Sequence, residues 1–260
     1  MSIWAEIKKS INNDLEIPLN VLIKNGVIGG YQLFTSSGEF TVPIGVTRIL
    51  ITAIGSGGGG GGAGSVYTYN VADSSGFYVN SSACGGGGGS GYYIKDRAKI
   101  VTPGTKIAIT INAGGVGGTG AVGARNEIGG TGGTGGSVIV GNLLTVNGGN
   151  GGLGATYAER SSSSGDTSGT GGAGGTGGVV GSKGTNSDLK GSDGVLKNIA
   201  GGTGGIPLEV FGGAYGRGGQ GGDATVTEVA KQWYAGKPGS VGNTGAVLIC
   251  WGQFTHDTLY

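Results

Sequence analysis

The chain has 260 residues, of which 67 are glycine, only 12% are charged and the formal net charge is +1. Glycine makes up about 7% of average proteins, yet five prolines and the lack of a strict Gly-X-Y repeat exclude collagen. Near-neutral charge argues against nucleic-acid binding, and a 36% hydrophobic content is too high for most disordered chains.

The start of the chain differs from the rest because residues 1–24 contain no glycine. Trp4, Ile7 and Ile11 recur at spacings of three and four, which predicts one apolar stripe on a helix that Pro18 stops or restarts. A helix of about 12 residues is marginal alone in water. We therefore expect it to dock on a partner protein, its own copies or the next domain. We assign residues 1–30 to a helical segment for attachment or oligomerisation, with these three residues as its contacts. No secretory signal or membrane span is predicted.

Apolar and polar residues alternate on both sides of the glycine-rich part, which predicts β-strands. The predicted strands cover residues 31–35, 40–43, 46–54, 91–94, 98–101, 106–112, 137–140, 143–146 and 246–251. Since strands flank the glycine region at both chain ends, we expect one β-sandwich that this region interrupts. The final strand is expected to pair beside the first ones.

Glycine is concentrated in runs with a Gly-Gly-X period of three. Eight runs stand out, at residues 57–62, 85–89, 114–120, 129–136, 148–154, 171–178, 201–205 and 212–222. A polyproline II type helix has three residues per turn, rises about 3.1 Å per residue and has no internal hydrogen bonds. We therefore expect a bundle of such rods that bond to one another through their backbones, with X residues at the rim. Flexible glycine linkers are the alternative.

Residues for catalysis or metal binding are scarce. Cys84 and Cys250 are expected to be buried free thiols, although the sequence leaves open whether they pair. One histidine, His256, and two remote cysteines do not make a usual zinc site. No carboxylate pair or phosphate-binding loop stands out. We expect no enzyme activity, no cofactor and no metal.

The segments between the glycine runs are polar and aromatic, as binding loops on a rigid scaffold often are. They cover residues 66–82, 155–168, 182–199, 206–217 and 225–237. The alternative is that their aromatic residues cap the bundle or fill a core. As a group we predict that they bind a ligand, and the candidate residues are Tyr67, Tyr69, Tyr78, Tyr157, Arg160, Tyr215 and Trp233.

Three stretches carry a resemblance to a known family. Residues 40–62, with FTVPIGVT and ILITAIGSGGGGGG, resemble the opening of glycine-rich domains in bacteriophage tail-fibre proteins, as do VTPGTKIAITINAGG at 101–115 and GAVLICW at 245–251. The Gly-Gly-X runs resemble the polyglycine II bundle of tip adhesins from T-even-like phages. A springtail antifreeze protein has similar packing, and the glycine-rich domain of anaplastic lymphoma kinase joins such rods to a TNF-like sandwich. The pattern from Trp4 to Pro18 is similar to the start of tail proteins from phages or prophages of Gram-positive bacteria.

The resemblance implies a mostly β fold, in which a TNF-like or jelly-roll-like β-sandwich with an inserted polyglycine II bundle covers residues 31–254. A short N-terminal α-helix precedes it, and residues 255–260 form a tail. The implied function is a phage or phage-like tail-fibre receptor-binding protein, an adhesin of the virion for host attachment. Its ligand would be a host cell-surface glycan or protein, bound non-covalently by loops at the rod ends. These loops vary within the family, so no binding residue is carried over by motif.

We expect residues 1–24 to contact other tail or baseplate proteins, and a homo-oligomer, with a trimer favoured. Three other functions stay open. A structural virion or fibre protein would need no ligand, and a depolymerase would digest the cell surface. An ice-binding protein would present regular Thr or Ala at X positions on one face.

Overall fold

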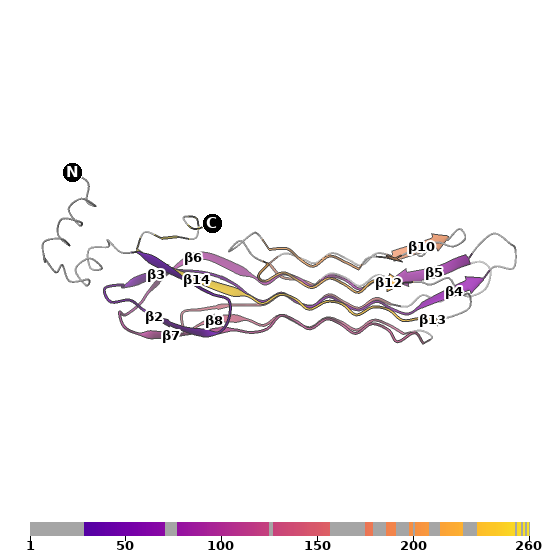
Figure 1. Cartoon of the computed structure of the whole chain (residues 1–260), viewed down its shortest axis with the longest axis horizontal. Helices are drawn as coiled ribbons and strands as arrows, with labels where there is room; N and C mark the ends of the chain where they lie inside the picture. Colours follow the sequence, from indigo (N-terminus) through magenta and orange to yellow (C-terminus); the bar gives the residue numbers. More distant parts are fainter. Residues whose placement is uncertain are drawn as a thin grey trace, which may run out of the picture.

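The protein is elongated, with β-sheets at both ends and extended glycine-rich segments running side by side between them (Figure 1). The computed structural model describes residues 29–70, 77–124, 127–156, 175–178, 186–190, 198–199, 201–207, 214–225, 233–252, 254–255, 257 and 259. The predicted helix, with Trp4, Ile7 and Ile11, lies outside these ranges. Within them, no helix is long and apolar enough to cross a lipid bilayer.

One end of the molecule, which contains the first described strands, consists of two antiparallel four-stranded sheets. We call it the two-sheet region. The first sheet has the order β1 (Gly30–Phe34), β14 (Ala246–Trp251), β3 (Arg48–Ile54) and β6 (Tyr93–Ile100). The second has the order β2 (Gly38–Thr41), β7 (Lys106–Ile111), β8 (Val138–Val140) and β9 (Leu144–Val146). The expectation that the final strand pairs beside the first ones is confirmed, because β14 lies between β1 and β3.

One strand prediction is wrong in a specific way. Residues 91–94 and 98–101 do not form two strands, because β6 runs continuously past the polar sequence between them. The register with β3 shifts between Ile51 and Ala53. At this bulge Asp96 has a φ of 46°. Its N–H donates to the Oγ1 of the buried Thr52 at 2.9 Å, which satisfies the displaced backbone group.

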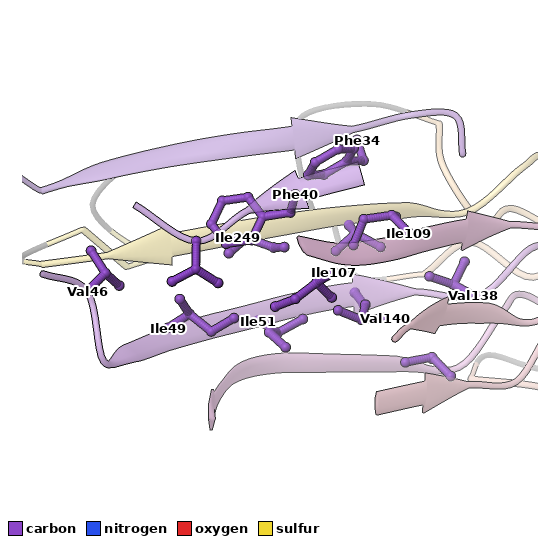
Figure 2. Packing of buried hydrophobic residues seen from close by; sticks show 14 residues of the cluster. Phe34, Phe40, Val46, Ile49, Ile51, Ile107, Ile109, Val138, Val140 and Ile249 are labelled. Atoms are coloured by element: carbon purple, nitrogen blue, oxygen red, sulfur yellow. The ribbon is translucent and has the colours of Figure 1, made fainter. Parts of the chain in front are cut away.

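The two sheets share one apolar core (Figure 2). Alternate residues of the first sheet point into it, including Ile49 and Ile51 of β3 and Ile249 of β14. Ile109 of β7 and Val138 of β8 meet them from the second sheet. Complete burial of such a side chain stabilises a fold by roughly 1.5–3 kcal/mol.

The outer face of the first sheet carries a second apolar cluster of Ile54, Ala246, Leu248 and Cys250. Residues of the chain end, Phe254 and Leu259, pack against it. Lys95 of β6 forms an ion pair with Asp257 in the same segment. β14 is therefore buried on both faces, which explains its unbroken apolar sequence AVLIC.

Between the sheets lies a set of extended segments, side by side, that we call the glycine array. Its centre is segment 55–65, which exchanges backbone hydrogen bonds of 2.7–3.1 Å with six neighbours. It donates to three segments and accepts from three others. Donation goes to 84–91, 128–136 and 236–245, and acceptance comes from 113–121, 147–156 and 214–223.

The bonds of the central segment repeat every three residues. The N–H groups of Gly57 and Gly60 donate to segment 236–245, and those of Gly58 and Gly61 donate to segment 84–91. A Cβ added at Gly58 or Gly60 would overlap the carbonyl oxygen of a neighbouring segment. None of the positions 57–62 has room for a side chain, which explains six consecutive glycines.

The outer segments have room on one side only. In 113–121, 128–136 and 147–156 every third residue is exposed and every third is buried. The exposed residues are those at X, such as Val116 at 68% and Leu153 at 50%. This matches the expectation that X residues lie at the rim.

Segment 236–245 belongs to the array although the sequence analysis did not assign it. Its glycines, Gly236, Gly239, Gly242 and Gly245, come only at every third position. A Cβ at Gly239 would overlap the carbonyl oxygen of Gly60, whereas the residues between the glycines are mostly exposed. A single glycine per triplet therefore suffices where only one side faces the centre.

The opposite end of the molecule holds a third antiparallel sheet, which we call the distal sheet (Figure 1). Its order is β10 (Asn186–Lys190), β5 (Phe77–Ala83), β4 (Val66–Asn70) and β13 (Trp233–Tyr234). A two-stranded sheet of β11 (Asn198–Ile199) and β12 (Ala224–Thr225) completes the described elements, and β12 lies close to β5. The interpretation of residues 66–82 as a loop is therefore wrong for the described residues 66–70 and 77–82, which lie in β4 and β5.

Candidate functional site

The distal sheet is supported by the centre of the glycine array. Segment 55–65 runs directly into β4, and β5 runs directly into segment 84–91. These are the two inner strands of the sheet. At the junction the buried Ser65 bonds with its backbone N–H and its side-chain oxygen to Glu127, at 3.0–3.2 Å. The strands that carry candidate residues therefore start from fixed backbone.

The register of the distal sheet brings four candidate residues together. Tyr67 of β4 is the direct partner of Trp233 of β13. Tyr69 of β4 is the direct partner of Tyr78 of β5. Tyr67 and Tyr69 are two residues apart, and directly opposed residues share a face. All four positions therefore fall on one face of the sheet, which we call the aromatic face.

Polar residues share the aromatic face on its other half. Asn80 is the register partner of Tyr67, and Lys190 of β10 is the partner of Tyr78. The register of β10 shifts between Ser187 and Leu189, which sets Ser187 opposite Ser82 and still leaves Lys190 in line with Tyr78. In register, the positions of this face are Trp233 on β13, Tyr67 and Tyr69 on β4, Tyr78, Asn80 and Ser82 on β5, and Ser187 and Lys190 on β10.

The other face of the sheet has a different composition. Its register rows set Val66 beside Tyr234, and Val79 between Thr68 and Leu189. Phe77 follows on the same face, opposite Asn70. Every aliphatic residue larger than alanine in the four strands falls on this side. By the pattern of one-sided sheets, this face is the one suited to burial.

The remaining candidate residues do not join the aromatic face. Tyr215 lies at the other end of the array, half-buried against the cluster of Ile54 and Leu248. Tyr157 and Arg160 lie outside the described residues. Asn80 and Lys190 were not among the candidates, although alternation in YTY and YVN was a usable signal for strands and faces.

Candidate metal ligands and thiols were sought in the described ranges. No group of three or more His, Cys, Asp or Glu residues in them is placed to hold a metal ion. Cys84 and Cys250 are buried thiols, as expected. Burial raises the pKa of Cys250 to about 11, so its thiol is protonated at neutral pH.

No protein-family model matches the chain, and no curated protein matches its sequence. The functional interpretation therefore rests on where the structure places the chain's own residues.

Proposed function

We propose that the protein is a receptor-binding protein, or adhesin, of a phage or phage-like tail fibre. The observation that carries this proposal is the aromatic face, where Tyr67, Tyr69, Tyr78 and Trp233 share one side of a sheet at the end of an elongated molecule. Tyrosine and tryptophan offer large contact area at low entropic cost and dominate many interfaces. A binding surface at the far end of a rod is suited to reaching a cell surface.

The scaffold that we propose is a TNF-like or jelly-roll-like β-sandwich with an inserted polyglycine II bundle. The shared apolar core of the two sheets supports the sandwich. Bonds in three repeating phases, six neighbours around segment 55–65 and the threefold exposure pattern support polyglycine II helices. Such a bundle is rigid because its backbone groups are bonded in several directions.

In this proposal the glycine array acts as a rigid spacer, and the distal sheet binds the ligand. A bundle without interior side chains offers little for specific recognition, whereas the aromatic face offers both apolar surface and hydrogen-bonding groups. Binding is non-covalent and needs no catalysis. Residues 1–30 attach the protein to other tail or baseplate proteins of the virion, and a homo-oligomer, with a trimer favoured, presents several tips.

The test is binding of the labelled full-length chain to a panel of bacterial strains. We expect saturable binding to some strains, and at least about a tenfold loss of affinity on the double substitution Tyr67→Ala and Tyr69→Ala. Tyr92→Ala is the matched control, since Tyr92 is 47% exposed beside β6 at the opposite end. Equal binding by the double variant and the control, or no binding to any strain, would contradict the proposal.

A second candidate, ice binding, is favoured by one observation. Adjacent outer segments present small exposed X residues in rows, with Ala113, Val116 and Thr119 beside Thr131 and Thr134. Thermal hysteresis of the full-length chain tests it. A hysteresis that Thr131→Lys abolishes would favour this function, and none at millimolar protein would remove it.

A further inference from the structure

The aromatic face has a polar border whose chemistry narrows the class of ligand. Trp233 and Tyr67 form one cross-strand row that continues to Asn80. Tyr69 and Tyr78 form the next row, which continues to Lys190. Each row thus changes from aromatic to polar in the same direction across the sheet. Consecutive residues on one face of a strand are about 6.6–6.8 Å apart, so the two rows are close neighbours.

This two-part composition fits a carbohydrate ligand. A sugar ring has a C–H face that stacks on aromatic rings and an edge of hydroxyl groups that needs donors and acceptors. Asn80 supplies both donor and acceptor, and Ser82 and Ser187 supply hydroxyls on the same side of the sheet.

The charged residues of the distal sheet narrow the class of ligand further. The four strands of the distal sheet carry two charged residues, Asp188 and Lys190. Asp188 stands at the register shift and is not aligned with a residue of β5, whereas Lys190 is aligned with Tyr78. An ammonium group beside an aromatic row favours a ligand that carries a carboxylate or phosphate.

We propose that the aromatic face binds an acidic glycan, with Asn80 and Lys190 as specificity-determining residues. The sugar rings stack on Tyr67, Tyr69 and Trp233, Asn80 binds ring hydroxyls, and Lys190 binds the acidic substituent. This inference rests on the proposed adhesin function and names the ligand class of the same face.

The test uses the full-length chain on an array of neutral and acidic bacterial polysaccharides. We expect binding to one or more acidic polysaccharides and about tenfold weaker binding to their chemically neutralised (carboxyl-reduced or dephosphorylated) forms. Lys190→Gln should cause a similar loss on the acidic polysaccharide and almost none on the neutral form. Asn80→Ala should weaken binding to both. Lys99→Gln, on β6 of the two-sheet region, is the control and should change neither.

The outcomes separate this inference from the adhesin proposal. If the chain binds cells but no polysaccharide, and protease treatment of the cells removes binding, the ligand is a protein and only the glycan inference fails. If neutral and acidic polysaccharides bind equally, the role of Lys190 is overturned. If the chain binds neither cells nor polysaccharides, the adhesin proposal fails as well. Unchanged thermal melting of each variant shows that a loss is not due to unfolding.

Discussion

The two-sheet region and the glycine array are both ordered, but packed side chains stabilise the first and backbone hydrogen bonds stabilise the second. The two-sheet region buries side chains such as Phe40, Ile49 and Ile51 between two sheets. The array buries almost none, and its segment 55–65 is held by backbone bonds to six neighbours. Hydrophobic burial tolerates side chains of similar volume, whereas the glycines of segment 55–65 have no room for any side chain. The two regions therefore differ in which substitutions they permit: exchange of similar apolar side chains in the core, and no side chain at the central glycines.

The largest expected effect comes from adding a side chain at the centre of the array. Gly60→Val would drive its Cβ into the carbonyl oxygen of Gln220 and separate segment 55–65 from its neighbours. We expect a loss of more than about 4 kcal/mol, or failure to fold. Denaturant unfolding and yield of folded protein measure it.

The matched substitution for this test is Leu153→Val at an exposed X position. It should change stability by less than about 0.5 kcal/mol. Similar melting of the two variants would mean that the three-residue phase has no structural role.

The next effect removes a side chain from the two-sheet region. Ile51→Ala leaves a cavity in the shared core and should lower the free energy of unfolding by about 2–5 kcal/mol. Ile100→Ala is the control, because Ile100 is 78% exposed on the edge strand β6. Equal losses in both variants would contradict the assigned core.

A smaller effect is expected where the two regions join. The Oγ of the buried Ser56 donates to the carbonyl oxygen of Asn112 at 2.6 Å and accepts from the N–H of Gly245 at 2.8 Å. Ser56→Ala leaves both groups without this partner and should cost about 1–3 kcal/mol. Amide hydrogen exchange should speed up at Gly245, whereas the exposed Ser36→Ala should change neither quantity.

The smallest effect concerns alkaline pH. Burial raises the pKa of Cys250 from 9.0 to about 11, so above pH 9 the unfolded chain loses this proton first. The contribution is fully present below pH 9 and is lost as the pH rises towards 11. We expect the melting temperature of Cys250→Ala to fall less steeply between pH 9 and 11 than that of the original chain. Parallel slopes would show that the thiol is accessible to water.

The sequence predicted what depends on local pattern. The alternation around Ile49 and Ile249 placed β3 and β14, and the Gly-Gly-X period placed most segments of the array and their exposed residues. It missed what depends on distant partners. Segment 236–245 has a reduced glycine pattern because only one side of it faces the centre, and the pairing of Tyr67 with Trp233 joins residues 166 positions apart. The bulge at Asp96 looked like a break because its compensating partner, Thr52, is on another strand.

For the candidate site, residue types were predictable and their grouping was not. Four of the seven candidates share the aromatic face only because the register of three strands aligns them. Tyr215 has the same side-chain chemistry but lies at the other end of the array, against Ile54. A glycine-rich sequence gives little local information on which end of the molecule each connecting segment occupies.

The central segment also sets a rule for how the molecule can change in length. Ser56 and Ser65 bond at its two ends, and between them each neighbour is met once per triplet. Insertion of one or two residues would turn every later backbone N–H and C=O group of the segment towards a different neighbour, whereas insertion of three would restore the partners. All neighbours would need the same addition. The length of the glycine array can therefore change only in steps of three residues that all its segments share. The residue types in the distal sheet can change by single substitutions.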